Sequence, residues 1–273
     1  MSKEGGLLHK GKTNDWGGYH SNMKETEELT TAWQGDGTSI FDPVLCEIVY
    51  RWFNIPKGKI IDPFAGGSVR GIVAEYLGYD YTGIELRKEQ IKSNVEQAVE
   101  ILKDKKPKWI EGDALNIDEL TKQKYDLIFS CPPYFDLEVY SKDKRDISNH
   151  SWEDFKRDYK TIITKTCSLL NNNSFAVYVV SDIRDKKGSY RLLPEFTKQC
   201  FVESDLMLYN EIILVNAVGS LPVRVGRMFN GYRKVGRMHQ LVLVFYKGDP
   251  KTIKSKFKEL EFDREIFEDA STN

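Results

Sequence analysis

The sequence predicts an α/β protein built on a doubly wound, mostly parallel sheet, with an antiparallel strand pair late in the chain. Short apolar runs typical of buried strands alternate with longer segments of helical periodicity. Chemically distinctive residues fall at the predicted carboxyl ends of the strands, where sheets of this class bind ligands. With 273 residues, the chain is long enough for one large domain with a complete core.

The first half of the domain begins with a helix after Pro43, in which apolar residues recur at helical spacing. Gly78 is suited to end the second helix, because glycine adopts the conformation of a helix C-cap. The third helix carries a single apolar stripe formed by Ile91, Val95, Ala98 and Leu102. The predicted elements are a helix from about 43, a strand at 59–62, a helix at 69–77, a strand at 81–85, a helix around 91–102 and a strand ending at 109–113.

The second half contains an apolar strand at 125–130 and a helix whose apolar residues run from Trp152 to Leu170. A continuous apolar run at 175–180 is typical of a fully buried strand. A helix at 192–200 and a strand pair at 206–218 and 241–247 complete the core. The chain is accordingly divided into an irregular N-terminal arm at 1–37, a domain at 38–250 and a charged C-terminal tail at 251–273.

Composition and charge exclude several classes of protein. The formal net charge is −1, so any nucleic-acid partner must be recognised through local patches. The four cysteines lie apart without metal-ligand spacing, which favours reduced thiols over structural zinc or a disulfide framework. No apolar run approaches the length of a membrane span, and the first residues lack the apolar core of a signal peptide. We therefore expect a cytoplasmic protein without a metal site.

A glycine turn follows the strand at 59–62 and consists of Asp62-Pro63-Phe64-Ala65-Gly66-Gly67-Ser68. Glycine lets the backbone approach a ligand closely and adopt positive φ. The N-terminus of the following helix favours a carboxylate, such as that of methionine. The spacing is not the GxGxxG of a dinucleotide-binding turn. The alternative is a tight turn without a ligand.

Two acidic residues end the neighbouring strands. Glu85 can accept both ribose hydroxyls of a bound nucleoside, and the alternative is a solvated surface glutamate. Asp113 can accept the adenine amino group of the same ligand, and the alternative is a helix N-cap or turn aspartate.

The strand at 125–130 ends at Cys131-Pro132-Pro133-Tyr134. Proline has no N–H and fixes its φ angle, so the strand must stop there. The turn exposes the Pro132 carbonyl and an aromatic face on Tyr134. These groups suit a flat, hydrogen-bonding ligand, such as a base held by its exocyclic amino group.

Taken together and in this order, the segments DPFAGGS, YTGIEL, EGDA and DLIFSCPPY resemble the cofactor and catalytic motifs of the DNA amino-methyltransferases. The resemblance covers about Thr38 to Lys247, and its late stretches are similar to stand-alone methylases of phages and mobile elements. It implies a Rossmann-like class I methyltransferase fold, S-adenosylmethionine as cofactor and double-stranded DNA as partner. It also implies a solitary methylase or one half of a restriction–modification pair. The cofactor-binding residues that it implies are Ser39, Phe41, Asp62, Pro63, Phe64, Ala65, Gly66, Gly67, Ser68, Glu85 and Asp113.

The same resemblance assigns roles to the catalytic turn. Tyr134 would stack on the target base, and the Pro132 carbonyl would accept a hydrogen bond from the amino group of that base. An exocyclic amine is a poor nucleophile because its lone pair is delocalised into the ring. Catalysis then rests on positioning and electrostatics, and the base must leave the duplex.

Cys131 departs from the Asp, Asn or Ser that the family carries at this position. Sulfur is a weak hydrogen-bond acceptor. Cysteine is nearly isosteric with serine, and the serine version of the motif is commoner among cytosine-N4 enzymes, which favours cytosine N4 as the target. The general abundance of adenine enzymes favours adenine N6, so the target base stays open. Two other roles for Cys131 are a covalent nucleophile and a small buried filler.

A basic segment at 219–239 lies between the two late strands and contains no acidic residue. We interpret it as a glycine-punctuated loop that contacts DNA phosphates, with a solvated hairpin as the alternative. A second, weaker basic patch lies at 184–191, and a mobile loop is expected at 136–150 near the flipped base. The predicted DNA-binding residues are Arg224, Arg227, Arg233, Lys234 and Arg237.

Two other functions stay open beside DNA methylation. Similar proline turns occur in enzymes that methylate RNA bases or protein glutamine amides; the basic segment favours nucleic acid over protein without separating DNA from RNA. A catalytically inactive nucleic-acid-binding module on the same fold is the second alternative, which the departure at Cys131 keeps open. For the assembly, a homodimer is one option.

Overall fold

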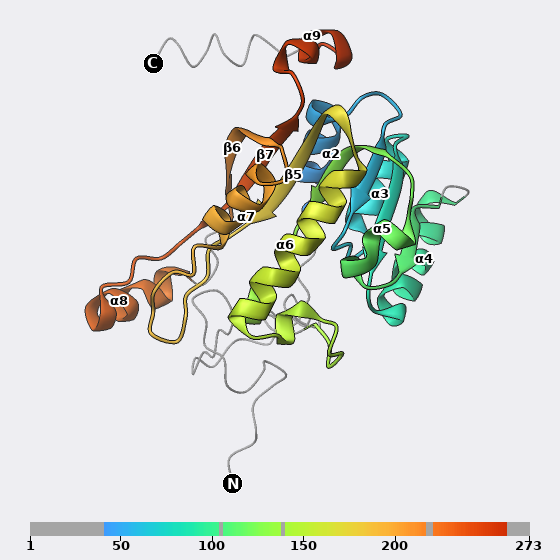
Figure 1. Cartoon of the computed structure of the whole chain (residues 1–273). Coiled ribbons are helices and arrows are strands. Elements are labelled where there is room, and N and C mark those ends of the chain that lie inside the picture. Colours follow the sequence, from blue (N-terminus) through green and yellow to red (C-terminus); the bar gives the residue numbers. More distant parts are fainter. Residues whose placement is uncertain (1–40, 104–105, 138–139, 217–220, 261–273) are drawn as a thin grey trace.

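The computed structural model describes residues 41–103, 106–137, 140–216 and 221–260, with the backbone alone at 221–224. The described residues form a seven-stranded sheet in the order β3-β2-β1-β4-β5-β7-β6 (Figure 1). Strands β1 to β5 run parallel, and β7 is antiparallel to both β5 and β6, which confirms the predicted sheet. The bounds are β1 Lys59–Asp62, β2 Asp80–Glu85, β3 Lys108–Glu111, β4 Tyr125–Ser130, β5 Leu170–Val180, β6 Met207–Val215 and β7 His239–Lys247.

The strand order reverses between β1 and β4. From β1 the chain moves outward through β2 and β3, and it then returns to the other side of β1 to place β4 and β5. Ile60 pairs with Leu127 and Ile61 with Ile128, so the two strands are in parallel register and their carboxyl ends lie side by side. Sheets of this class bind ligands at such a switch point.

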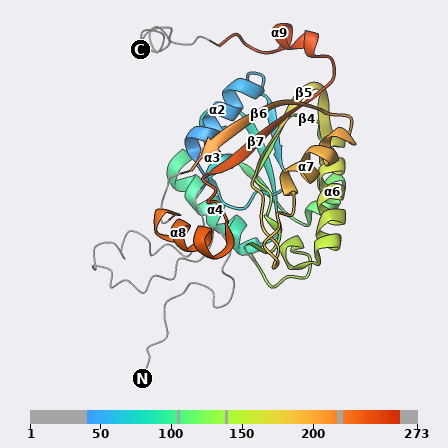
Figure 2. The same ribbon diagram turned by 90° about the vertical axis from the view of Figure 1, so that its left-hand side faces the viewer.

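Helices cover both faces of the sheet, and Figure 2 shows the two layers with the strands between them. On one face, Val49 of α2 and Ala74 of α3 are buried in one apolar cluster. On the other face, Ile117 of α5, Tyr159 of α6 and Phe201 of α7 are buried in a second cluster. The helix bounds are α2 Pro43–Phe53, α3 Val69–Tyr76, α4 Lys88–Leu102, α5 Ile117–Leu120, α6 Trp152–Leu169 and α7 Leu193–Val202.

The predicted apolar stripe of the third helix is correct at three of its four positions and wrong at Val95. In α4 the buried residues are Asn94 and Ala98, whereas Val95 is 41% exposed. The physical reason is a hydrogen bond from the Asn94 side chain to the carbonyl of Gly66, which turns this polar residue toward the sheet. The helix therefore supports the glycine turn with a polar side chain that the periodicity did not reveal.

The basic segment predicted as a loop contains a helix, α8 (Leu221–Tyr232). Gly226 and Gly231 favour a loop because glycine weakens helices. The helix forms with Pro222 in its first turn, a position that tolerates proline, and with Val225 and Tyr232 at helical spacing. Figure 1 shows α8 projecting beyond the end of the sheet. The described residues of the predicted loop at 136–150 are largely irregular. They include the end of one short 3₁₀ turn, η2 Phe135–Leu137, and the whole of another, η3 Ile147–Asn149.

The remaining described elements are short. They are η1 Ala114–Asn116, η4 Pro250–Thr252 and α9 Ile253–Lys256. The predicted tail begins against the core, because the ring of Phe257 packs edge-on against Phe175 with centroids 5.0 Å apart. Among the helices of the described ranges, none combines the length and the apolar character that a membrane span requires.

Candidate active site

Two turns predicted to carry the chemistry lie next to each other at the switch point. The glycine turn follows β1, and the turn Cys131–Tyr134 follows β4, its parallel neighbour. A hydrogen bond joins their bases: the Ser130 hydroxyl donates to a carboxylate oxygen of Asp62 over 2.6 Å. The two turns, which are far apart in the sequence, are thus neighbours in the fold.

Asp62 holds the glycine turn from beneath. Its side chain is fully buried. Besides Ser130, it accepts hydrogen bonds from the Arg70 guanidinium over 2.6 Å and from the Tyr81 hydroxyl over 2.8 Å. The backbone N–H of Phe64 donates to it as well. This carboxylate, predicted to bind the cofactor, faces protein groups and acts as the anchor of the turn.

Arg70 completes this anchor. Its guanidinium donates to the carbonyls of Phe64 and Ala65 over 2.7 and 2.9 Å, so it spans the turn as well as pairing with Asp62. The guanidinium also lies 4.7 Å from the ring centroid of Phe41, a predicted cofactor residue at the start of the described chain. Ser39, the other residue predicted in that segment, lies outside the described residues.

The exposed side of the turn is formed by glycine backbone. Gly66 has a φ of +52°, in the left-handed region that favours glycine. Side-chain atoms added at Gly66 or Gly67 would begin in open space. Glu85 and Asn94 fix the peptide groups of Gly66, because the carboxylate accepts its N–H over 3.0 Å and the amide donates to its carbonyl over 2.8 Å. The turn is rigid yet open toward a ligand.

The other residues of the predicted cofactor turn serve the core. Pro63 and Ala65 are buried, and the ring of Phe64 stacks on Tyr159 with centroids 6.1 Å apart. Ser68 precedes α3, and its hydroxyl donates to the Gln97 side chain over 2.5 Å. The most exposed part of the turn is therefore the backbone around the two glycines.

Glu85 ends β2 beside the glycine turn. Besides Gly66, it accepts the N–H of Arg87 over 2.8 Å. Burial raises the pKa of this carboxyl, although the hydrogen bonds from Arg87 and Gly66 oppose the shift. The structure therefore excludes the alternative of a solvated surface glutamate, since the residue is only 9% exposed.

Asp113 follows β3 and caps η1. One carboxylate oxygen accepts the N–H of Leu115 over 2.9 Å. This is the N-cap role that the sequence offered as the alternative to ligand binding. The neighbouring Gly112 donates its N–H to the carbonyl of Glu85, so the ends of β2 and β3 are tied together. The structure thus brings Asp113 to the same edge of the sheet as Glu85.

In the second turn, Tyr134 is held in place through its hydroxyl by two neighbouring strands. This hydroxyl lies 2.9 Å from the side-chain oxygen of Gln240 on β7 and 3.3 Å from the carbonyl of Val179 on β5. The Cys131 sulfur lies 3.4 Å from the same hydroxyl. Burial, with a further contribution from Cys131, raises the pKa of the Tyr134 phenol, which therefore stays protonated and acts as no base at neutral pH. Pro132 is buried, and Pro133 is partly buried.

The predicted DNA-binding residues lie outside this pair of turns. Arg227 and Arg233 are exposed on and just after α8, and Lys234 and Arg237 are partly buried on the way to β7. The side chain of Arg224 lies outside the described residues. β7 connects this segment to the catalytic turn through the contact between Gln240 and Tyr134.

Several residues that shape the site carry no local sequence signal. Ser130 directly precedes the catalytic turn, and this position is its signal in the sequence. Asn94 is a polar residue next to a predicted apolar stripe, which is a weak signal. The remaining members are Arg70, Tyr81 and Gln240, which reach the site only through the tertiary fold.

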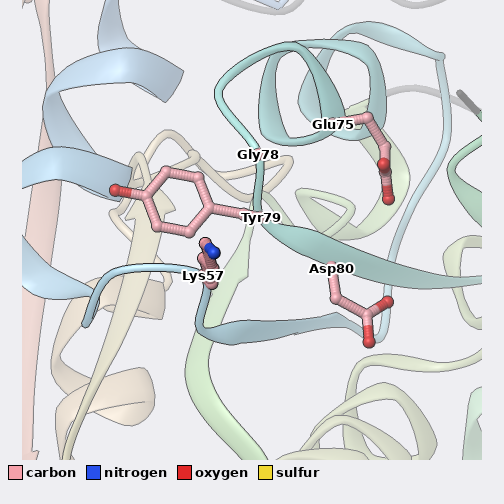
Figure 3. Close-up of a pocket in the computed structure, with 5 residues that line it drawn as sticks. All are labelled: Lys57, Glu75, Gly78, Tyr79 and Asp80. Atoms are coloured by element: carbon pink, nitrogen blue, oxygen red, sulfur yellow. The ribbon is translucent and has the colours of Figure 1, made fainter.

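A hollow in the surface lies at the opposite edge of the sheet, near the amino ends of β1 and β2. Figure 3 shows its lining, and the side chains of Lys57, Glu75 and Asp80 do not converge on a common point. Its position separates it from both turns at the carboxyl edge. Within the described ranges, no group of three or more His, Cys, Asp or Glu side chains is arranged to hold a metal ion.

Comparison with known proteins shows the fold. No family model matches the chain, and no curated protein matches it in sequence. TrmN from Thermus thermophilus is similar with a TM-score of 0.53 at 15% identity, over 81% of this chain and 52% of TrmN, so the chain spans about half the length of that protein.

Two further structures match over most of both chains. A putative sarcosine dimethylglycine methyltransferase from Galdieria sulphuraria has a TM-score of 0.50 at 13% identity, over 76% of this chain and 85% of its own. The magnesium protoporphyrin IX methyltransferase from Synechocystis PCC 6803, solved with bound SAM, has a TM-score of 0.50 at 12% identity, over 82% and 92%. The predicted Rossmann-like methyltransferase fold is confirmed.

Proposed function

We propose that the protein is an S-adenosylmethionine-dependent methyltransferase that modifies the exocyclic amino group of a flipped base in DNA, either cytosine N4 or adenine N6. The observation that carries this proposal is the juxtaposition of the glycine turn and the Cys131–Tyr134 turn on neighbouring strands, joined by the bond from Ser130 to Asp62. A cofactor on the first turn would lie next to a base held by the second.

The residues at the carboxyl edge fit S-adenosylmethionine. The open backbone at Gly66 and Gly67 leaves room for the ligand, and the following helix N-terminus favours its carboxylate. Glu85 offers a buried carboxylate to the ribose hydroxyls, and Asp113 lies at the next strand end for the adenine amino group. When bound, the cofactor supplies a methyl group on a positively charged sulfur.

The chain itself orients the base. The Tyr134 ring offers a stacking surface, and its hydroxyl is fixed by Gln240 and Val179, so the ring holds one orientation. The Pro132 carbonyl accepts one hydrogen bond from the amino group, which favours the geometry in which the nitrogen lone pair can react. Positioning of this kind can replace covalent catalysis.

Cys131 acts in this proposal as a hydrogen-bonding residue beside Tyr134. The contact of 3.4 Å between its sulfur and the tyrosine hydroxyl places it in the turn, and the protonated phenol is no base for activating the thiol. This contact with Tyr134 therefore does not activate the thiol as a nucleophile.

Replacement of Cys131 by serine is expected to keep kcat within about twofold of the wild-type value, because the hydroxyl preserves the hydrogen-bonding role. Cys131→Ala, which removes the group, is expected to lower kcat by about 2- to 10-fold. Steady-state methyl transfer checks both values. If Cys131→Ser has no activity while still binding the cofactor, the covalent role must be reconsidered.

The basic residues between β6 and β7 support nucleic acid over a protein substrate. No acidic residue lies in the segment that contains Arg227, Arg233, Lys234 and Arg237, whereas the whole chain has a net charge of −1. A methyltransferase acting on RNA bases is the second candidate, because the same surface and the same proline turn would serve it.

The test of function is methyl transfer to unmodified duplex DNA, followed by digestion to nucleosides and mass spectrometry. The proposal expects N4-methyldeoxycytidine or N6-methyldeoxyadenosine, and the product also identifies the base. An RNA substrate is assayed in parallel with the same cofactor. Cofactor binding by calorimetry without methylated product from either nucleic acid would point to the inactive binding module.

A further inference from the structure

A short hairpin after β5 presents a cationic surface. The backbones of Arg184 and Tyr190 form an isolated antiparallel bridge, and the turn between them closes with the N–H of Asp185 bonded to the carbonyl of Ser189. The Arg184 guanidinium lies over the Tyr190 ring, 3.8 Å from its centroid, and also donates to the carbonyl of Gly188. The hairpin is therefore ordered by its own side chains.

This hairpin packs against the segment that follows α8. The Arg237 guanidinium lies 5.6 Å from the centroid of the same Tyr190 ring, so the tyrosine contacts cations from both segments. The Lys234 side chain passes so close to Gly188 that a β-carbon there would lie 3.1 Å from it. Two patches that are separate in the sequence are thus continuous in the fold.

We call this region the composite basic surface. It consists of Arg184, Lys186, Lys187, Arg233, Lys234 and Arg237. The carboxylate among these cations is Asp185, which accepts the backbone N–H groups of Ser189 and Lys187; these bonds lower its pKa and keep it charged. The neighbouring Asp182 is only 5% exposed. The outward charge of the region is therefore strongly positive.

The composite basic surface borders the catalytic turn. Its two segments continue from the strands that hold the Tyr134 hydroxyl: Val179 is near the end of β5, and Gln240 is near the start of β7. A nucleic-acid strand held on this surface would therefore approach the Tyr134 side of the candidate site. Exposed lysine and arginine side chains are the groups that contact nucleic-acid phosphates.

We infer that the composite basic surface binds the phosphate backbone of duplex DNA beside the target base, so that the hairpin at 184–190 shares in DNA binding with the segment after α8. This inference rests on the proposed function. It adds a second binding element and predicts that Lys186 and Lys187, which are exposed at the tip of the hairpin, contact phosphates.

The test compares two double variants with the same charge change. Lys186→Ala with Lys187→Ala removes two cations from the hairpin, and Lys251→Ala with Lys254→Ala removes two exposed cations near α9, at the opposite end of the domain. Affinity for a short unmodified DNA duplex is measured by fluorescence anisotropy between about 50 and about 200 mM salt. The hairpin variant is expected to reduce the slope of log K against log salt by about 1.8, since each phosphate contact contributes about 0.9.

The control variant is expected to keep the wild-type slope. Equal salt slopes for both double variants would overturn the inference. It would also be overturned if the protein did not bind DNA and the hairpin variant showed its reduced slope with RNA alone. Methyl transfer by the wild-type protein separates this result from the proposed function. Methylated DNA together with a wild-type salt slope in the hairpin variant would exclude DNA binding by the composite basic surface and leave the proposed function standing. A reduced salt slope without any methylated nucleoside would exclude the proposed catalysis and leave the DNA-binding surface standing.

Discussion

Arg70→Leu is expected to lower the free energy of unfolding by about 3–5 kcal/mol, because it leaves the buried Asp62 carboxylate without its cationic partner. Arg70 is 5% exposed and Asp62 is fully buried, so water cannot replace the lost pair. The carbonyls of Phe64 and Ala65 lose their donors at the same time. Urea denaturation followed by circular dichroism measures the change.

The matched control is Arg51→Leu. Arg51 also pairs with a carboxylate, Glu47, but on the surface of α2 with its side chain 55% exposed. Exposed pairs of this kind contribute about 0–1 kcal/mol, so the control should unfold close to the wild-type midpoint. A loss below about 1 kcal/mol in Arg70→Leu would contradict the anchoring role, because breaking a buried pair costs more than that.

The Asp62 anchor also links stability to cofactor binding. Because Arg70 spans the glycine turn and Asp62 is bonded to Ser130 at the base of the catalytic turn, both turns depend on one buried group. In Arg70→Leu, cofactor affinity measured below the unfolding transition is expected to fall as well. Asp62 is thus expected to affect the site through the two turns that it joins.

The sequence was sufficient for the fold class and for the proximity of the two predicted turns at one edge of the sheet. Parallel strands place their carboxyl ends at one edge, so the predicted ends of β1, β2 and β4 already placed the glycine turn, Glu85 and Cys131 together. Turn chemistry is local: glycine and proline restrict the backbone wherever they occur. These features could therefore be predicted without knowledge of tertiary contacts.

The rest depended on contacts that are distant in the sequence. Gln240 reaches Tyr134 across 106 residues, and no local pattern marks such a partner. In α4 the buried polar Asn94 shifted the inward face away from Val95, because a hydrogen bond to Gly66 outweighed the apolar periodicity. In α8 the two glycines suggested a loop, whereas the backbone continues as a helix through both. Each difference arises where a specific contact or a longer element overrides a local preference.

Tyr134→Ala is expected to reduce kcat/KM by about 5- to 150-fold, since stacking of a base on an aromatic ring contributes about 1–3 kcal/mol. The ring lies on the turn that would hold the base, and its fixed hydroxyl keeps it in one orientation. Cofactor affinity should stay at the wild-type value, because the glycine turn and Glu85 do not contact this side chain in the described hydrogen bonds. Steady-state kinetics and calorimetry on the same preparation measure the two quantities separately.

Two variants make this prediction specific. Tyr134→Phe keeps the ring and removes the bond to Gln240, so its loss of activity should be smaller than that of the alanine variant, and a loss as large would assign the effect to the hydroxyl anchor. Tyr76→Ala removes a tyrosine that is 73% exposed on α3 and should leave kcat/KM unchanged. Wild-type activity in Tyr134→Ala would exclude stacking on this residue, and the base would then have to be held by other groups near the Pro132 carbonyl.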